Sequence, residues 1–204
     1  MNNVEIGILG AGNIGRAFAR HLVRAGHRVL IANRHGPASL KSLIAELGPN
    51  ARAAAALEVA SQKIVLVAIP WTELSEAMGE LPPWNGRIVI DANNHILGFD
   101  GKHFQLADLH GRTSTEIFSD MVPGAHVVKA LNTLAAEVLA QEPRVGSGRR
   151  VVFVSGNEAT SKKTISDLLV TVGFSPIDLG TLAVGGQLQQ AGGPLSGLNL
   201  VSIS

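Results

Sequence analysis

A glycine-rich turn between an apolar strand and a helix constrains the fold of this chain more than any other feature. The apolar run VEIGIL begins at Val4 and leads into a G-x-G-x-x-G pattern formed by Gly10, Gly12 and Gly15. The first glycine permits a tight turn, the second leaves the backbone open to a ligand, and the third lets helix and strand pack closely. Because the pattern follows a strand and opens a helix, it predicts a strand–helix–strand unit that binds a dinucleotide.

The helix predicted after this turn runs from Asn13 to Ala25. Its first residues, Asn13 and Ile14, would direct unpaired N–H groups and the positive end of the helix dipole at a pyrophosphate. We therefore include both residues, with the three glycines, in the expected cofactor site.

Six further apolar runs alternate with helical patterns along the chain. They are Arg28 to Asn33, Lys63 to Pro70, Arg87 to Ala92, His126 to Leu131, Arg150 to Ser155 and Ser175 to Leu179. Several lack the alternation of a half-exposed strand, which indicates parallel strands covered by helices on both faces. We predict an α/β fold with one Rossmann-like, doubly wound, mostly parallel sheet, in which residues 1–204 form a single domain with a short C-terminal extension. The segment from Asn93 to Gly111 is expected to be a surface loop.

Composition excludes several classes of protein. The 204 residues, 46% hydrophobic and 16% charged, suit one core, and a net charge of +1 gives no reason to expect a nucleic-acid partner. The absence of Cys and Tyr excludes thiolate zinc sites, cysteine nucleophiles and Tyr–Lys proton donors. The seven histidines lack H-x-H or H-E-x-x-H spacing, so we expect no metal. With no apolar leader before Val4 and no membrane-length apolar run, a cytoplasmic protein without membrane contact is expected.

The end of the second predicted strand indicates which dinucleotide binds. NAD enzymes normally place an acidic residue there to accept a hydrogen bond from the ribose 2′-hydroxyl, whereas this chain has Asn33, Arg34 and His35. Arg34 can pair with a 2′-phosphate, helped by Asn33, by protonated His35 and by Ser39 at the start of the next helix. The pattern favours NADP(H). The alternative is that Arg34 is a solvated surface residue and that the site does not distinguish NADP(H) from NAD(H).

Other polar and aromatic residues lie where parallel strands end. Pro70 and Trp71 close one strand, and Trp71 can wall the cofactor or be an ordinary rim aromatic. Asn93 is assigned to the nicotinamide end of the site. The alternative is that Asn93, or its neighbour Asn94, is an ordinary turn residue after a strand. Asn132 is expected to touch nicotinamide or the second substrate.

Lys129 is the one tempting catalytic base, but it lies inside the predicted strand HVVKAL. A structural lysine is therefore favoured, and we assign no catalytic residue.

Several longer stretches, GILGAGNIGRAFARHLVRAGHRVLIANRHGPASL, VLVAIPW, VVKALNTL, VVFVSGNEATSKKTISDLLVTVGFSPIDLG and GGQLQQAGGPLSGLNL, resemble one known family almost from end to end. That family is the NADP oxidoreductases that use the deazaflavin coenzyme F420, and it is also similar to the cytosolic domain of the STEAP metalloreductases. The resemblance implies NADPH in the glycine turn, a planar redox acceptor over the nicotinamide, and a homodimer. Where this family commonly reads Asn-Ser-Arg-Gly-Pro, this chain has Asn33, Arg34, His35, Gly36 and Pro37, so the arginine stands one position earlier.

The resemblance also gives residues 184–204 a function. This glycine-rich tail is expected to form the acceptor site through Gly193, Pro194 and Leu195, and a flexible chain end is the alternative. Hydride transfer to a flavin-like ring needs aligned rings and no acid–base pair. We therefore expect an NADP(H) oxidoreductase that acts on coenzyme F420. The alternatives are an NADPH-dependent reductase of free flavin or another small acceptor, and an NADP(H)-sensing protein without turnover.

Overall fold

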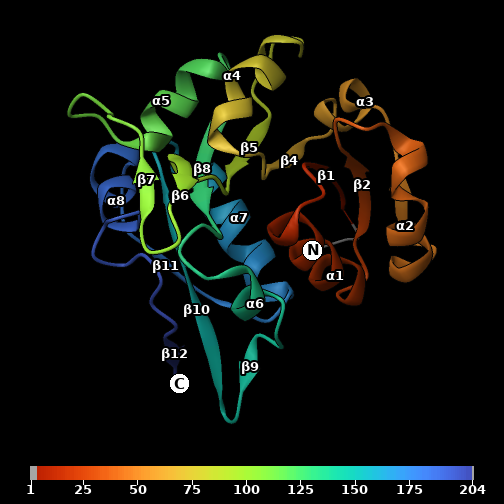
Figure 1. The fold of residues 1–204 in the computed structure, drawn as a ribbon. Coiled ribbons are helices and arrows are strands. Elements are labelled where there is room, and N and C mark those ends of the chain that lie inside the picture. The colour runs from red at the N-terminus through yellow and green to blue at the C-terminus, as the bar shows by residue number, and fades with distance from the viewer. Residues whose placement is uncertain (1–3, 204) are drawn as a thin grey trace.

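A computed structural model describes residues 4–203 of the chain and shows one large twisted sheet between two layers of helices (Figure 1). The sheet follows the order β11-β10-β8-β5-β4-β1-β2-β3. Its strands are β1 (Glu5–Leu9), β2 (Arg28–Ala32), β3 (Ala51–Ala53), β4 (Ile64–Val67), β5 (Ile88–Asp91), β8 (His126–Ala130), β10 (Gly148–Gly156) and β11 (Ser175–Asp178). All neighbours on this path are parallel except β8 and β10. The doubly wound, mostly parallel Rossmann-like sheet predicted from the sequence is confirmed.

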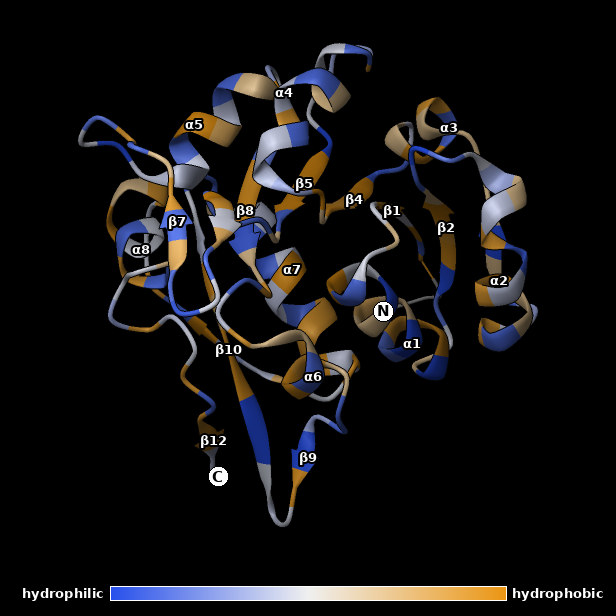
Figure 2. Ribbon diagram, viewed as in Figure 1, coloured by the Kyte–Doolittle hydropathy of each residue, from blue (hydrophilic) through white to orange (hydrophobic). Residues whose placement is uncertain are grey.

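The helices cover both faces of the sheet. They are α1 (Asn13–Arg24), the 3-10 helix η1 (Pro37–Leu40), α2 (Lys41–Leu47), α3 (Ala56–Ala60), α4 (Trp71–Gly79), α5 (Ser114–Met121), α6 (Ala136–Leu139), α7 (Ala159–Thr171) and α8 (Leu182–Gln189). One buried cluster joins Phe18 of α1 and Ile165 of α7 to Ile8 of β1, and the other joins Leu74 of α4 and Phe118 of α5 to the opposite face. Residues of β4 and β5 belong to both clusters, so both faces of these strands are buried in apolar surroundings, and both strands have mainly the hydrophobic colour in Figure 2.

The segment predicted as a surface loop, Asn93 to Gly111, instead contains a β-hairpin. Its strands β6 (Ile96–Phe99) and β7 (Phe104–Leu106) are antiparallel and pair Phe99 with Phe104. The Asp100 carboxylate accepts hydrogen bonds from the backbone N–H groups of Lys102 and His103, and Gly101 takes a positive φ of 95°. The loop expectation was wrong because this Asp-Gly turn, with an aromatic residue on each side, is a hairpin signal.

Two short strands extend the other end of the sheet. The strands β9 (Arg144–Val145) and β12 (Val201–Ser202) both pair antiparallel with the first residues of β10, Gly148 to Arg150. This part of β10 projects from the body of the molecule beside the end of the chain (Figure 1). Within residues 4–203, no helix is both long enough and apolar enough to cross a membrane.

Candidate cofactor-binding site

The turn after β1 has a geometry that only glycine allows at two of its positions. Gly10 has a φ of +103°, and a Cβ placed on it would lie 2.1 Å from the carbonyl oxygen of Ala68. A Cβ on Gly15 would lie 2.0 Å from the carbonyl oxygen of Gly10. These contacts fix a tight turn and bring α1 against β1, the structural roles that the spacing predicts.

Gly12 is different, because a Cβ built on it meets no other atom within 4 Å. It is the N-cap residue of α1, where no side chain caps the helix and no acidic residue lies in the first turn. The following residues, Asn13 and Ile14, present the first N–H groups of the helix at an open surface. Open space beside an uncapped helix N-terminus fits a pyrophosphate.

A cleft of about 450 Å³ extends from this turn to the end of β2 and to α4. It is lined by Leu9, Gly10, Ala11, Gly12, Arg16, Ala32, Asn33, Arg34, His35, Ala56, Ala68, Ile69, Pro70, Glu73, Ala77, Met78, Glu80 and Leu81. It thus brings together six of the predicted cofactor residues: Gly10, Gly12, Asn33, Arg34, His35 and Pro70. The shape fits the phosphate and adenosine half of a dinucleotide.

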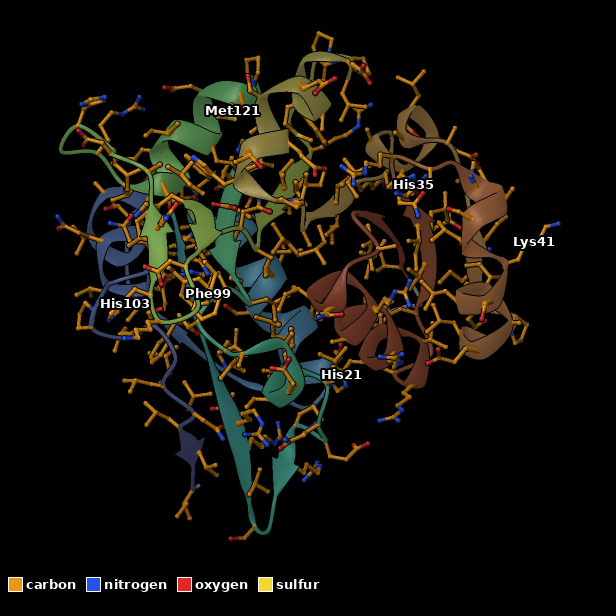
Figure 3. All side chains as sticks on the ribbon, viewed as in Figure 1. His21, His35, Lys41, Phe99, His103 and Met121 are labelled. Carbon is orange, nitrogen blue, oxygen red and sulfur yellow. The ribbon has the colours of Figure 1, made fainter. Side chains whose placement is uncertain are left out.

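The turn that follows β2 is held by its own side chains. The Asn33 Oδ1 accepts hydrogen bonds from the backbone N–H of His35, at 2.9 Å, and from the Ser39 hydroxyl, at 3.1 Å. The Ser39 hydroxyl also lies 2.7 Å from the carbonyl oxygen of Gly36. Asn33 and Ser39 therefore set the course of the backbone, and Arg34 and His35 carry the exposed polar groups (His35 is labelled in Figure 3).

Three charged residues of the cleft, Arg16, Glu73 and Glu80, were not predicted from the sequence. Arg16, on the first turn of α1, donates from Nε to the Ala11 carbonyl oxygen at 2.7 Å beside the glycine turn. Glu73, in the first turn of α4, accepts a hydrogen bond from Nη1 of Arg34 at 2.6 Å. Arg16 follows Gly15 directly, so its place on the helix was available as a signal, whereas the partner of Arg34 is 39 positions away in sequence.

The prediction that Pro70 and Trp71 end a strand was wrong, because both residues lie at the start of a helix. β4 stops at Val67, Pro70 is the N-cap of α4, and Trp71 is its first residue. Proline is favoured at helix starts because its ring fixes φ and its missing N–H needs no partner. Trp71 meets the ring of His95 edge-on, at a centroid distance of 6.3 Å, and is absent from the lining of the cleft.

His95 is buried at the carboxyl end of β5, and its Nδ1 finds no hydrogen-bond partner within residues 4–203. Burial, and to a smaller extent the positive charge of Lys129, lowers the pKa of His95. A buried ring with a depressed pKa is neutral at physiological pH.

Asn93 is buried in a polar network below the cleft. Its Oδ1 accepts from the backbone N–H of Ile69 at 2.8 Å, and its Nδ2 donates to Asp91 at 2.8 Å. Nζ of Lys129 reaches both Asp91 Oδ2 and the Asn93 carbonyl oxygen at 2.9 Å. These bonds join the ends of β4, β5 and β8. The nicotinamide contact assigned to Asn93 stays a prediction.

Asn132 attaches the C-terminal segment to the same edge of the sheet. Its Nδ2 donates to the Gln189 carbonyl oxygen at 2.7 Å and lies 3.0 Å from Asn94 Oδ1, while Gln189 Nε2 donates back to Asn132 Oδ1 at 3.1 Å. Asn94 Oδ1 also accepts from the backbone N–H of Ala191. The end of α8 is therefore fixed next to the carboxyl ends of β5 and β8, where a dinucleotide-binding sheet places nicotinamide.

The predicted acceptor residues lie just beyond this attachment. A Cβ on Gly193 would come within 2.6 Å of the Gln187 carbonyl oxygen and 2.7 Å of that of Leu188, so this glycine packs against the end of α8. Pro194 is exposed, Leu195 is half-buried, and the Leu195 N–H donates to the Leu188 carbonyl at 3.0 Å. Pro194 and Leu195, whose side chains reach the surface, are therefore better candidates for contact with an acceptor than Gly193.

Comparisons with known proteins agree with this geometry. Residues 5–95, which contain the glycine turn and the cleft, match the family model described as NADP oxidoreductase, coenzyme F420-dependent. Metalloreductase STEAP3 of Rattus norvegicus is 29% identical over 88% of this chain and 34% of its own length. The chain thus spans about a third of the curated relatives it matches.

Two solved structures extend the similarity over most of the chain. A hypothetical protein of Sinorhizobium meliloti is 42% identical, with a TM-score of 0.91 over 98% of this chain and 96% of the other. A candidate F420-dependent NADP reductase of Arthrobacter sp. FB24 is 29% identical, with a TM-score of 0.73 over 88% of this chain and 86% of the other. The resemblance to the coenzyme F420-dependent NADP oxidoreductases and the STEAP metalloreductases that the sequence predicts is therefore confirmed, with residues 5–95 matching the family model itself.

Proposed function

We propose that this protein transfers hydride between NADP(H) and a flavin-like ring, and that coenzyme F420 is its acceptor. The observation that carries the cofactor half of the proposal is the cleft, which joins the open, uncapped turn at Gly12 to the guanidinium of Arg34. β2 ends without the carboxylate that would favour NAD(H), and Arg34 can bond a 2′-phosphate with its planar fork.

When bound, NADPH supplies the hydride, and the residues of this chain hold and orient it. Gly12 and the first N–H groups of α1 are suited to the pyrophosphate, and Arg16 adds a positive charge beside them. The buried set of Asp91, Asn93 and Lys129 fixes the strand ends beneath the site. Since Lys129 is fully buried and paired with Asp91, we expect it to support the sheet and not to exchange protons with a substrate.

The acceptor assignment rests on the family description and on the attachment of the C-terminal segment to the sheet edge. The bonds between Asn132 and Gln189 bring Pro194 and Leu195 toward the carboxyl edge of β8. An apolar side chain there can cover the face of a planar ring, and transfer then depends mainly on how well the two rings align.

The test is an NADPH consumption assay with coenzyme F420, FMN, FAD and riboflavin offered separately. The proposal expects NADPH oxidation with coenzyme F420, and a dissociation constant at least about tenfold lower for NADPH than for NADH. Turnover with a flavin but not with coenzyme F420 would favour the alternative of a flavin reductase. Arg34→Glu should erase or reverse this preference, and His35→Ala serves as its neighbouring control. Tight NADPH binding without turnover on any acceptor would instead favour an NADP(H)-sensing protein.

We also propose that the protein is a cytoplasmic homodimer whose partner is a small redox acceptor and which binds neither nucleic acid nor membranes. The family resemblance supports the homodimer, and the net charge of +1 supports the absence of a nucleic-acid partner. Light scattering coupled to size-exclusion chromatography tests the oligomeric state directly.

A further inference from the structure

An ion pair crosses the proposed cofactor cleft. Arg34 extends from the turn after β2, Glu73 extends from the first turn of α4, and Nη1 of the arginine lies 2.6 Å from Oε1 of the glutamate. Both residues line the cleft. The arginine proposed to bind the cofactor's 2′-phosphate therefore already holds an anion of the protein itself.

The pair is open to solvent on both sides. The Arg34 side chain is 67% exposed and that of Glu73 is 37% exposed. Exposed ion pairs of this kind are weak and are screened by salt, so a ligand can displace one partner. The Glu73 carboxylate also lies near the N-terminus of α4, where the helix dipole favours a negative charge.

We propose that Glu73 is a specificity-determining residue that competes with the 2′-phosphate of NADPH for Arg34. The inference rests on the proposed function, since it takes Arg34 as the phosphate ligand. To bind NADPH, Arg34 must exchange the Glu73 carboxylate for the phosphate, and the displaced carboxylate stays near a second anion. NADH carries a neutral 2′-hydroxyl in the same place, so it neither breaks the pair nor meets this repulsion. The preference for NADPH is consequently smaller than Arg34 alone would produce.

The main experiment measures the dissociation constants of NADPH and NADH by calorimetry at low ionic strength, for the unaltered protein and for Glu73→Gln. The competition predicts that Glu73→Gln binds NADPH at least about threefold more tightly and leaves the NADH constant within about twofold. Salt at several hundred millimolar should shrink the difference, because these charges are exposed. An NADPH constant that is unchanged or weaker in Glu73→Gln would overturn the proposal and would show that Glu73 orients Arg34 or has no effect on it.

Glu76→Gln is the matched control. Glu76 is an exposed glutamate of the same helix α4, it is absent from the lining of the cleft, and the part of the chain that the structure describes gives it no ion-pair partner. The substitution removes one negative charge from α4 without releasing Arg34, so the NADPH constant should change by less than about twofold. An equal gain in both variants would overturn the specific competition in favour of a general charge effect.

A second comparison repeats Glu73→Gln in an Arg34→Gln background. Without the arginine there is nothing to compete for, and the effect of Glu73→Gln on NADPH should fall below about twofold. An undiminished effect would overturn the role of Arg34 as the shared partner. If the proposed function were wrong, the unaltered protein would not prefer NADPH over NADH. If the unaltered protein prefers NADPH but Glu73→Gln does not bind it more tightly, only the competition is overturned.

Discussion

Nζ of Lys129 lies 2.9 Å from Oδ2 of Asp91, and both side chains are buried where β5 and β8 run side by side. The same Nζ donates to the Asn93 carbonyl oxygen at 2.9 Å. Lys129→Met should therefore leave a buried carboxylate without its cation and lower the free energy of unfolding by about 3–5 kcal/mol. Urea denaturation measures this loss.

Turnover of the folded Lys129→Met protein should stay within about tenfold of the unaltered protein, because the lysine donates to protein groups and not to a substrate. Adding Asp91→Asn should recover part of the lost stability, since no buried charge is then left unpaired. A several-hundredfold loss of turnover with unchanged NADPH affinity would contradict the structural role and point to proton transfer.

The second prediction separates two glycines of the same turn. A Cβ on Gly12 meets nothing within 4 Å, whereas one on Gly15 would lie 2.0 Å from the Gly10 carbonyl oxygen. Gly12→Val should raise the NADPH dissociation constant at least about a hundredfold, by filling the pyrophosphate space, and should leave the melting temperature nearly unchanged. Gly15→Ala should lower the melting temperature because α1 must move away from the turn. NADPH titration and thermal melting of both variants decide the matter, and normal binding by Gly12→Val would contradict the placement of the cofactor.

The sequence predicted most of the sheet because buried parallel strands are continuous apolar runs. All seven predicted strands are present. The strands β3 (Ala51–Ala53), β9 and β12 were missed because each has only two or three residues, too few for an apolar pattern to stand out. β10 runs antiparallel to β8, a direction that no local pattern encodes. The hairpin of β6 and β7 carried a readable Asp-Gly signal that the polar residues around it obscured.

Some features of the site could also be predicted from local sequence, and others could not. Glycine spacing predicts the turn because part of the constraint is local: Gly10 has a positive φ, and a Cβ on Gly15 would collide with the Gly10 carbonyl oxygen five residues earlier. The pair of Arg34 with Glu73 and the bonds of Asn132 to Gln189 depend on distant segments meeting in three dimensions, which one sequence does not reveal. Gly185 and Gly186 lie in the tail that was predicted to form the acceptor site, but they let α8 pack closely: a Cβ on Gly185 would lie 2.5 Å from Ser155 Cβ, and one on Gly186 would lie 2.8 Å from Thr115 Cγ2.

The third prediction tests the acceptor site in the C-terminal segment. A change at Gly193 is unsuitable, because any Cβ there collides with carbonyl groups at the end of α8. Leu195→Ser should lower kcat/KM for the acceptor by at least about tenfold and keep the NADPH constant within about threefold, since apolar cover for the ring is lost. Leu200→Ser, at an exposed leucine further along the chain, is the control and should change neither. Equal acceptor kinetics in the two variants would remove Leu195 from the site.

The last prediction concerns pH and the buried histidines His21, His27 and His95. In each, burial is the main cause that lowers the pKa from its usual value of about 6.5. Above that pH the histidines are neutral in both the folded and the unfolded state, so their contribution to stability is fully present. As the pH falls below about 6.5, the unfolded chain binds protons that the folded chain excludes, and the free energy of unfolding should fall by up to about 1.4 kcal/mol per pH unit for each histidine.

His21 offers the sharpest test, because its Nε2 lies 2.7 Å from the Leu139 carbonyl oxygen and its ring meets Phe174 edge-on. Urea unfolding between pH 7.5 and 5.5 should show a smaller loss of stability in His21→Gln than in the unaltered protein, even though the variant starts less stable. This pH range lies above the titration of carboxyl groups such as Glu158, whose pKa is held at about 2 by hydrogen bonds from Ser161 and Thr160. A pH dependence that is identical in the two proteins would show that His21 takes up no extra proton on unfolding, and the destabilisation by acid would then have to come from other groups.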